Sequence, residues 1–107
     1  MQYLSTKKAK ELYKAILLLK DDEECKRFLG DLLTSTEIKE FSNRWTVAQM
    51  LDKKEPYEKI TKATGMSSTT IARIQKWKNG KLQGYKLMLD RINKQNKDAH
   101  HTRPLAV

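Results

Sequence analysis

Apolar residues in this chain recur three and four positions apart, and this helical spacing constrains the fold more than any other feature. Between positions 8 and 19, for example, the apolar face is made by Leu12, Ala15, Ile16 and Leu19. No segment alternates apolar and polar residues between tight-turn dipeptides, as a half-buried strand would. We therefore predict an all-α chain of about six helices. Its 107 residues suit one domain with a modest core.

Polar residues mark where some of these helices should begin and end. Thr34 and Glu37 have the spacing of a capping box, which predicts a long helix after them. A last amphipathic helix should cover residues 82–92, and the sequence turns polar after it. We therefore expect a helical domain over residues 1–93 and a disordered polar tail over residues 94–107.

The segment from Tyr57 to Lys76, which we call the reading head, predicts a helix-turn-helix over about residues 56–78. Gly65 separates two short helical stretches, at a turn that requires a positive φ. Ser67 or Ser68 can cap the second helix. The apolar residues expected to hold the two helices at a steep angle are Ile60, Ala63, Met66, Ile71 and Ile74.

The net charge of +9 lies entirely in the second half of the chain. Residues 1–52 hold 9 Lys and Arg against 9 Asp and Glu, whereas residues 53–107 hold 13 against 4. A one-sided basic distribution is typical of proteins that bind polyanions, because each neutralised phosphate releases condensed counterions. From charge alone, a merely solubilising role is an equal alternative.

Two sets of side chains in and around the reading head are candidates for contact with duplex DNA. The first set faces outward from the second helix, where hydroxyl, methyl and basic groups can meet base edges in the major groove. It comprises Ser67, Ser68, Thr69, Thr70, Ala72, Arg73 and Lys76. The second set suits phosphates, which position a protein without specifying a sequence. It comprises Lys59, Lys62, Lys78 and Lys81.

Two alternatives share this pattern. One is a plain helical hairpin whose lysines form a solvated face. The other is a basic helical module that binds RNA or an acidic protein. Against RNA, the sequence offers no exposed aromatic platform for single strands, because Trp45, Trp77 and Tyr85 have the pattern of core residues.

Several other classes are excluded. The only histidines, His100 and His101, fall in the expected tail, and no nucleophile has a partner base, so we expect no enzyme, cofactor or metal. The single cysteine, Cys25, cannot form an intrachain disulfide. The first residues lack a signal-peptide core, and the longest apolar run, residues 15–19, is too short to cross a bilayer. We therefore expect a cytoplasmic protein that binds no membrane.

The helices expected over residues 8–19 and 82–92 are apolar over more than one narrow stripe. A chain of this size can hardly cover so much apolar surface alone. These residues support a homodimer and a compact monomeric bundle about equally.

Between about Leu33 and Ile92 the sequence resembles the tryptophan-repressor superfamily, in particular its YerC/YecD-like branch. The matching stretches are Leu-Thr-Ser-Thr-Glu-Ile at 33–38, Ser-Asn-Arg-Trp at 42–45, and Lys-Ala-Thr-Gly-Met-Ser-Ser-Thr-Thr-Ile-Ala-Arg at 62–73. The resemblance implies an intertwined homodimer of six-helix chains that represses transcription. Its two reading heads would meet half-sites about one helical turn, roughly 34 Å, apart on DNA.

The same resemblance implies a tryptophan pocket with two arginines, whose positions Arg44 and Arg73 match. Where tryptophan-binding members carry a glycine and a serine, this chain has Ile74 and Trp77, which would fill the cavity. We therefore expect that tryptophan is not its corepressor, and the sequence leaves any other effector open. Trp77 is either a built-in plug or a side chain packed beneath the head, and we prefer the second interpretation. Arg44 equally suits a surface or phosphate-contacting position.

Overall fold

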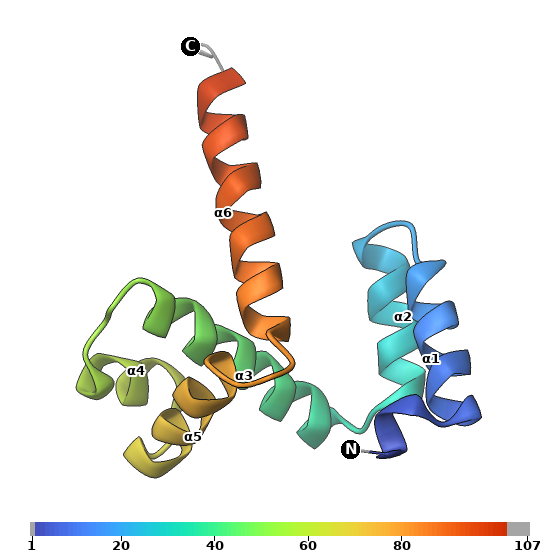
Figure 1. Cartoon of the computed structure of the whole chain (residues 1–107), viewed down its shortest axis with the longest axis horizontal. Coiled ribbons are helices and arrows are strands. Elements are labelled where there is room, and N and C mark those ends of the chain that lie inside the picture. The colour runs from blue at the N-terminus through green and yellow to red at the C-terminus, as the bar shows by residue number, and fades with distance from the viewer. Residues whose placement is uncertain (1, 103–107) are drawn as a thin grey trace. The chain divides into compact units, whose positions relative to one another are not determined.

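A computed structural model describes residues 2–102 of the chain and the side chains of residues 2–98. Within that range there are six α-helices, one 3-10 helix and no strand (Figure 1), which confirms the all-α prediction. The elements are η1 (Gln2–Ser5), α1 (Lys7–Leu17), α2 (Asp22–Leu32), α3 (Ser35–Asp52), α4 (Tyr57–Thr64), α5 (Ser68–Lys78) and α6 (Gly84–Thr102). No helix in this part of the chain is long and apolar enough to cross a membrane.

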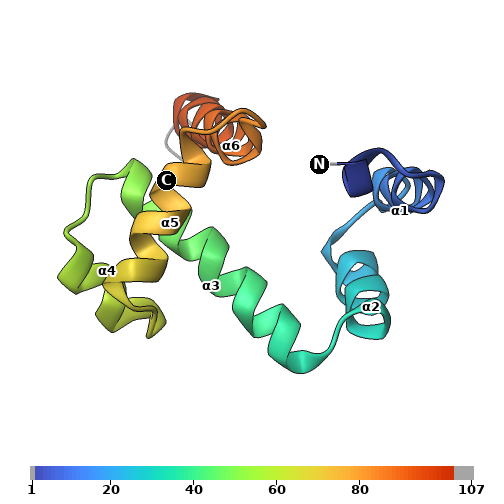
Figure 2. The same cartoon turned by 60° about the horizontal axis from the view of Figure 1, so that its bottom comes forward.

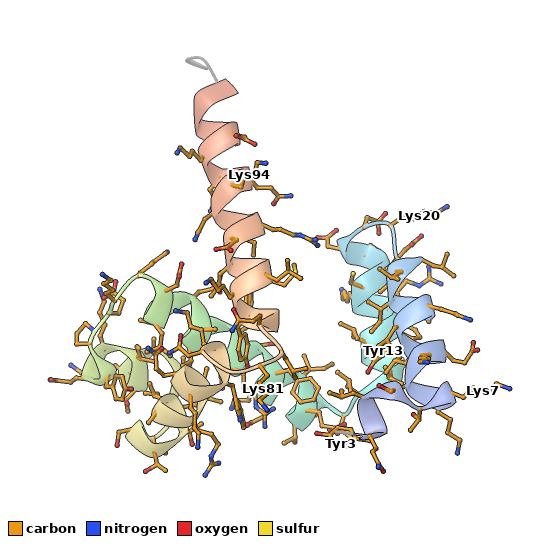
Figure 3. All side chains as sticks on the ribbon, in the orientation of Figure 1. Tyr3, Lys7, Tyr13, Lys20, Lys81 and Lys94 are labelled. Atoms are coloured by element: carbon orange, nitrogen blue, oxygen red, sulfur yellow. The ribbon has the colours of Figure 1, made fainter. Side chains whose placement is uncertain are left out.

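The chain forms two compact units, and the first ends at Lys39. It contains η1, α1, α2 and the first turn of α3. The Tyr13 hydroxyl donates to the Leu4 carbonyl at 2.8 Å and ties α1 to η1 (Figure 3). Neither α1 nor α2 buries a residue, and the side chains of Leu17 and Leu18 are 82% and 76% exposed. This unit therefore has an apolar surface that its own residues leave uncovered.

The capping box at the start of α3 is confirmed. The Glu37 amide donates to Thr34 Oγ1 at 3.1 Å, and the Thr34 amide donates to Glu37 Oε1 at 2.9 Å. Two amides that the helix itself cannot pair are thus satisfied reciprocally.

The second unit begins at Glu40 and holds the main hydrophobic core. Three helices and one turn supply its buried residues: Val47 and Ala48 from α3, Ile60 from α4, Met66 from the turn, and Ile71 and Ile74 from α5. Figures 1 and 2 both show α4 and α5 beside the C-terminal part of α3. Trp45, Met50, Leu51 and Tyr85 pack around this core. The core therefore fixes α5 against both α3 and α4.

The last helix is longer than the sequence pattern predicts, because α6 continues past Ile92 to Thr102. Its N-terminal part is anchored by Leu89, which is 3% exposed. Beyond Ile92 no glycine or proline interrupts the helix, and lysine and glutamine are good helix formers. Residues 94–102, which we expected in a disordered tail, are thus helical, and residues 103–107 lie outside the described range.

Gly65 allows the sharp change of direction between α4 and α5. Its φ is 74°, in the left-handed region, and its amide donates to the Thr61 carbonyl at 2.7 Å. A Cβ added at this position would meet no atom within 4 Å, so only the backbone conformation would resist a larger residue.

We expect Gly65→Ala to lower the free energy of unfolding by about 1–2 kcal/mol, because alanine resists a positive φ. Gly84→Ala is the matched control, because a Cβ there also meets open space and the backbone φ is not positive. Urea unfolding at one fixed protein concentration measures both variants. Equal effects of the two substitutions would contradict this explanation of the turn.

Candidate nucleic-acid interface

The reading head, Tyr57 to Lys76, comprises α4, the turn at Gly65 and all but the last two residues of α5. Four of the five predicted locking residues are confirmed, because Ile60, Ile71 and Ile74 are fully buried and Met66 is 8% exposed. The fifth prediction, Ala63, is wrong, since this residue is exposed.

Thr64 takes the inward place that the sequence pattern assigned to Ala63. It lies four positions after Ile60 and so shares its face more closely. Its hydroxyl donates to the Ile60 carbonyl at 2.8 Å and accepts from the Met66 amide at 3.2 Å. A polar side chain therefore connects the end of α4 to the turn.

Ser67 is the residue that caps α5. Its backbone is extended, and its hydroxyl accepts from the Thr70 amide at 3.2 Å and donates to Thr70 Oγ1 at 3.1 Å. The first helical residue is Ser68. Of the two serines that the sequence allowed as the cap, the structure thus has Ser67. Its hydroxyl is engaged in hydrogen bonds with Thr70.

Most of the candidate base-reading residues are exposed on α5, whereas its core contacts are made by Ile71 and Ile74. Thr70 is half-buried, and the exposed members are Ser67, Ser68, Thr69, Ala72, Arg73 and Lys76. Within the described part of the chain, the Arg73 guanidinium has no hydrogen bond or ion pair. This side of α5 thus offers hydroxyls, a methyl group and two cations to a ligand.

Three of the four candidate phosphate-binding lysines are exposed. Lys59 and Lys62 line a surface hollow of about 300 Å³ on α4, and Lys59 Nζ lies 3.0 Å from Glu55 Oε2. Lys81 lies in the turn between α5 and α6 (Figure 3). Lys59 and Lys62 thus lie within the reading head, and Lys81 follows it along the chain.

Lys78 has different surroundings. Its side chain is only 18% exposed, and its Nζ lies 3.9 Å from Asp52 Oδ1. Asp52 Oδ2 in turn accepts from Asn93 Nδ2 at 3.0 Å. This network joins the ends of α3 and α5 to α6. The sequence pattern indicated neither Asp52 nor Asn93, because residues so far apart along the chain share no local motif.

Four residues were predicted to form an effector pocket or its plug, and two of them, Arg44 and Trp77, are in contact. The Arg44 guanidinium carbon lies 5.6 Å from the centre of the Trp77 ring and 5.7 Å from that of Phe41. Ile74 points into the core, and Arg73 is on the exposed side of α5. Phe41 was not among the predicted site residues.

Tyr85 of α6 lies beside this arrangement. Its ring stacks on Trp45, with centroids 6.3 Å apart and planes 13° from parallel. Burial raises the pKa of the Tyr85 hydroxyl above its ordinary value, and the positive charge of Arg44 offsets part of that rise. Tyr85 therefore remains neutral at physiological pH and packs as an aromatic ring.

Among the residues whose side chains are described, no group of three or more His, Cys, Asp and Glu could hold a metal ion. The side chains of His100 and His101 lie outside this set.

The fold and the exposed face of α5 together define a helix-turn-helix protein. Comparison with protein families makes this more specific: the family described as Trp repressor protein matches residues 7–93. The chain belongs to the Trp repressor family, a family of transcription regulators.

Relatives of known sequence or structure agree with this membership. The chain is 42% identical over 89 residues to YerC of Bacillus subtilis (strain 168), an uncharacterized protein, with 83% of this chain and 86% of YerC covered. It is similar to the crystal structure of a TrpR-like protein from Eubacterium eligens ATCC 27750, with a TM-score of 0.82 and 36% identity over 87% of this chain and 96% of that one. A candidate Trp repressor from Staphylococcus aureus gives a TM-score of 0.80 and 36% identity over 86% and 92%.

We expect Ser67→Ala to lower the free energy of unfolding by about 1 kcal/mol, because the Thr70 amide loses its capping partner. Ser68→Ala should leave stability nearly unchanged, since Ser68 is an exposed first-turn residue. Thermal unfolding followed by circular dichroism compares the two. A larger loss for Ser68→Ala would contradict the assignment of the cap.

Proposed function

We propose that this protein is a sequence-specific regulator of transcription in the cytoplasm, a repressor that reads the major groove of double-stranded DNA with α5. The main support for the proposal is that α5 has one buried side and one exposed side. Ile71 and Ile74 are completely buried on one side. Arg73 is exposed on the other and has no partner in the described structure. Membership of the Trp repressor family supports the same function.

Each part of the exposed face has a distinct role in this proposal. Arg73 can donate two hydrogen bonds to a guanine, and Ser68, Thr69 and Ala72 offer hydroxyl and methyl contacts to neighbouring bases. Lys76 extends the same face. Lys59, Lys62 and Lys81 bind phosphates and set the register, whereas we assign Lys78 to holding the end of α5 through Asp52.

We further propose that the protein acts as a homodimer. Several apolar side chains are exposed on one chain, among them Ile16 (43%), Leu17 (82%), Leu18 (76%) and Leu32 (47%). Large apolar side chains exposed in this number are typical of a chain that buries them against a partner. Sedimentation equilibrium should give the mass of two chains at micromolar concentration, and a monomer at all concentrations would contradict the proposal.

The alternative, a basic module for RNA or an acidic protein, is tested by competition. In a gel shift, a random-sequence DNA duplex and an RNA duplex of matching sequence compete for the protein. We expect DNA to be preferred and some DNA sequences to be enriched over others. Equal affinity for both nucleic acids, with no preferred DNA sequence, would favour the alternative.

We expect Arg73→Ala to weaken binding to a duplex enriched by the wild-type protein by about 1–3 kcal/mol and to relax the preference at one base pair. Lys62→Ala is the matched control, because it also removes one exposed cation from the reading head. It should weaken binding to enriched and scrambled duplexes alike and flatten the salt dependence. Unchanged binding by Arg73→Ala would show that the assigned reading face is wrong.

A further inference from the structure

Arg44 lies between two aromatic rings from different helices. Its guanidinium carbon is 5.7 Å from the Phe41 ring of α3 and 5.6 Å from the Trp77 ring of α5, both within the range of a cation–π contact. Its Nε donates to Glu40 Oε2 at 3.3 Å, which fixes the guanidinium on α3.

Burial alone does not hold the Trp77 side chain. Ile74, one turn earlier on α5, has no exposed surface, whereas Trp77 is 45% exposed. The indole therefore lies at the surface of the second unit, and the contact with Arg44 is a specific partner for its ring. An indole left without that partner would keep much of its face in water.

Because Trp77 lies near the end of α5, its contact with Arg44 restricts how this helix is oriented. The residue lies in the last turn of α5, and Ser68 to Arg73 lie in the turns before it. The contact with Arg44 attaches this last turn to α3, and the ion pair of Lys78 with Asp52 attaches the same turn to the end of α3. A rotation of α5 about its core contacts would have to break both.

We propose that the Trp77 indole acts as an internal ligand of Arg44 and holds α5 in the orientation that reads DNA, so that no diffusible effector is needed. Trp77 and Arg44 are then positioning residues that need not touch the nucleic acid. This inference rests on the proposed function for its effect on DNA binding. The pairing of an indole with Arg44, however, can be tested without DNA.

The test begins with Trp77→Ala and free indole as the probe. Removing the side chain uncovers one side of the Arg44 guanidinium, where free indole can make the same cation–π contact as the Trp77 ring. We expect indole at millimolar concentration to raise the thermal midpoint of Trp77→Ala saturably and to leave the wild-type midpoint unchanged. The double variant Arg44→Gln/Trp77→Ala should not respond.

The second arm measures affinity for a DNA duplex enriched by the wild-type protein. We expect Trp77→Ala to bind about tenfold more weakly, because α5 is held in the reading orientation only part of the time, and indole to restore the affinity. Arg44→Gln should weaken binding similarly without rescue, and Trp77→Phe, which retains a ring, should bind nearly as tightly as the wild type. Gln95→Ala, which shortens an exposed polar side chain of α6 outside every assigned contact, is the control expected to have no effect.

The possible results separate the two proposals. Full affinity of Trp77→Ala for the duplex, or a loss that indole does not restore, overturns the internal ligand. Saturable stabilisation of the wild type by indole or tryptophan overturns it as well, because the place beside Arg44 would then be open. If the wild type binds no duplex DNA, the proposed function fails, and the indole response of Trp77→Ala still decides whether Arg44 accepts an indole there.

Discussion

The burial of two isoleucines of α5 is the interaction on which the rest of the second unit depends. Ile71 and Ile74 have no exposed surface and pack with residues of α3 and α4. Because they lie three positions apart on one side of the helix, their burial also decides which residues face outward. The exposed position of Arg73 is thus a consequence of core packing, and any function of the reading head begins from that geometry.

Two polar contacts supplement this packing where the core ends. Arg44 meets the Trp77 ring, and Asp52 meets both Lys78 and Asn93. Polar contacts between defined partners add rigidity and specificity to an apolar core. The last turn of α5 is therefore joined to α3 by specific pairs, although its tryptophan is partly exposed.

Local features of the fold could be predicted from the sequence, and long-range ones could not. The capping box of Thr34 and Glu37, the turn at Gly65 and the α5 cap each depend on residues within a few positions of one another. The prediction for Ala63 was wrong because positions three and four residues after Ile60 both lie on its side of the helix, and spacing alone does not choose between them. The surroundings of Lys78 depend on Asp52, which is far from it along the chain, so no local motif predicts them. The extension of α6 past Ile92 has no apolar face, so apolar spacing does not predict it.

Every role proposed for the reading head requires that the exposed side of α5 contacts DNA. Amide and side-chain NMR shifts of the protein, recorded with and without an enriched duplex, test it most directly because they report on every element at once. We expect the largest changes at residues 67–76 and smaller ones at Lys59, Lys62 and Lys81. Unchanged signals along α5, together with large changes on α1, α2 or the C-terminal half of α6, would contradict it.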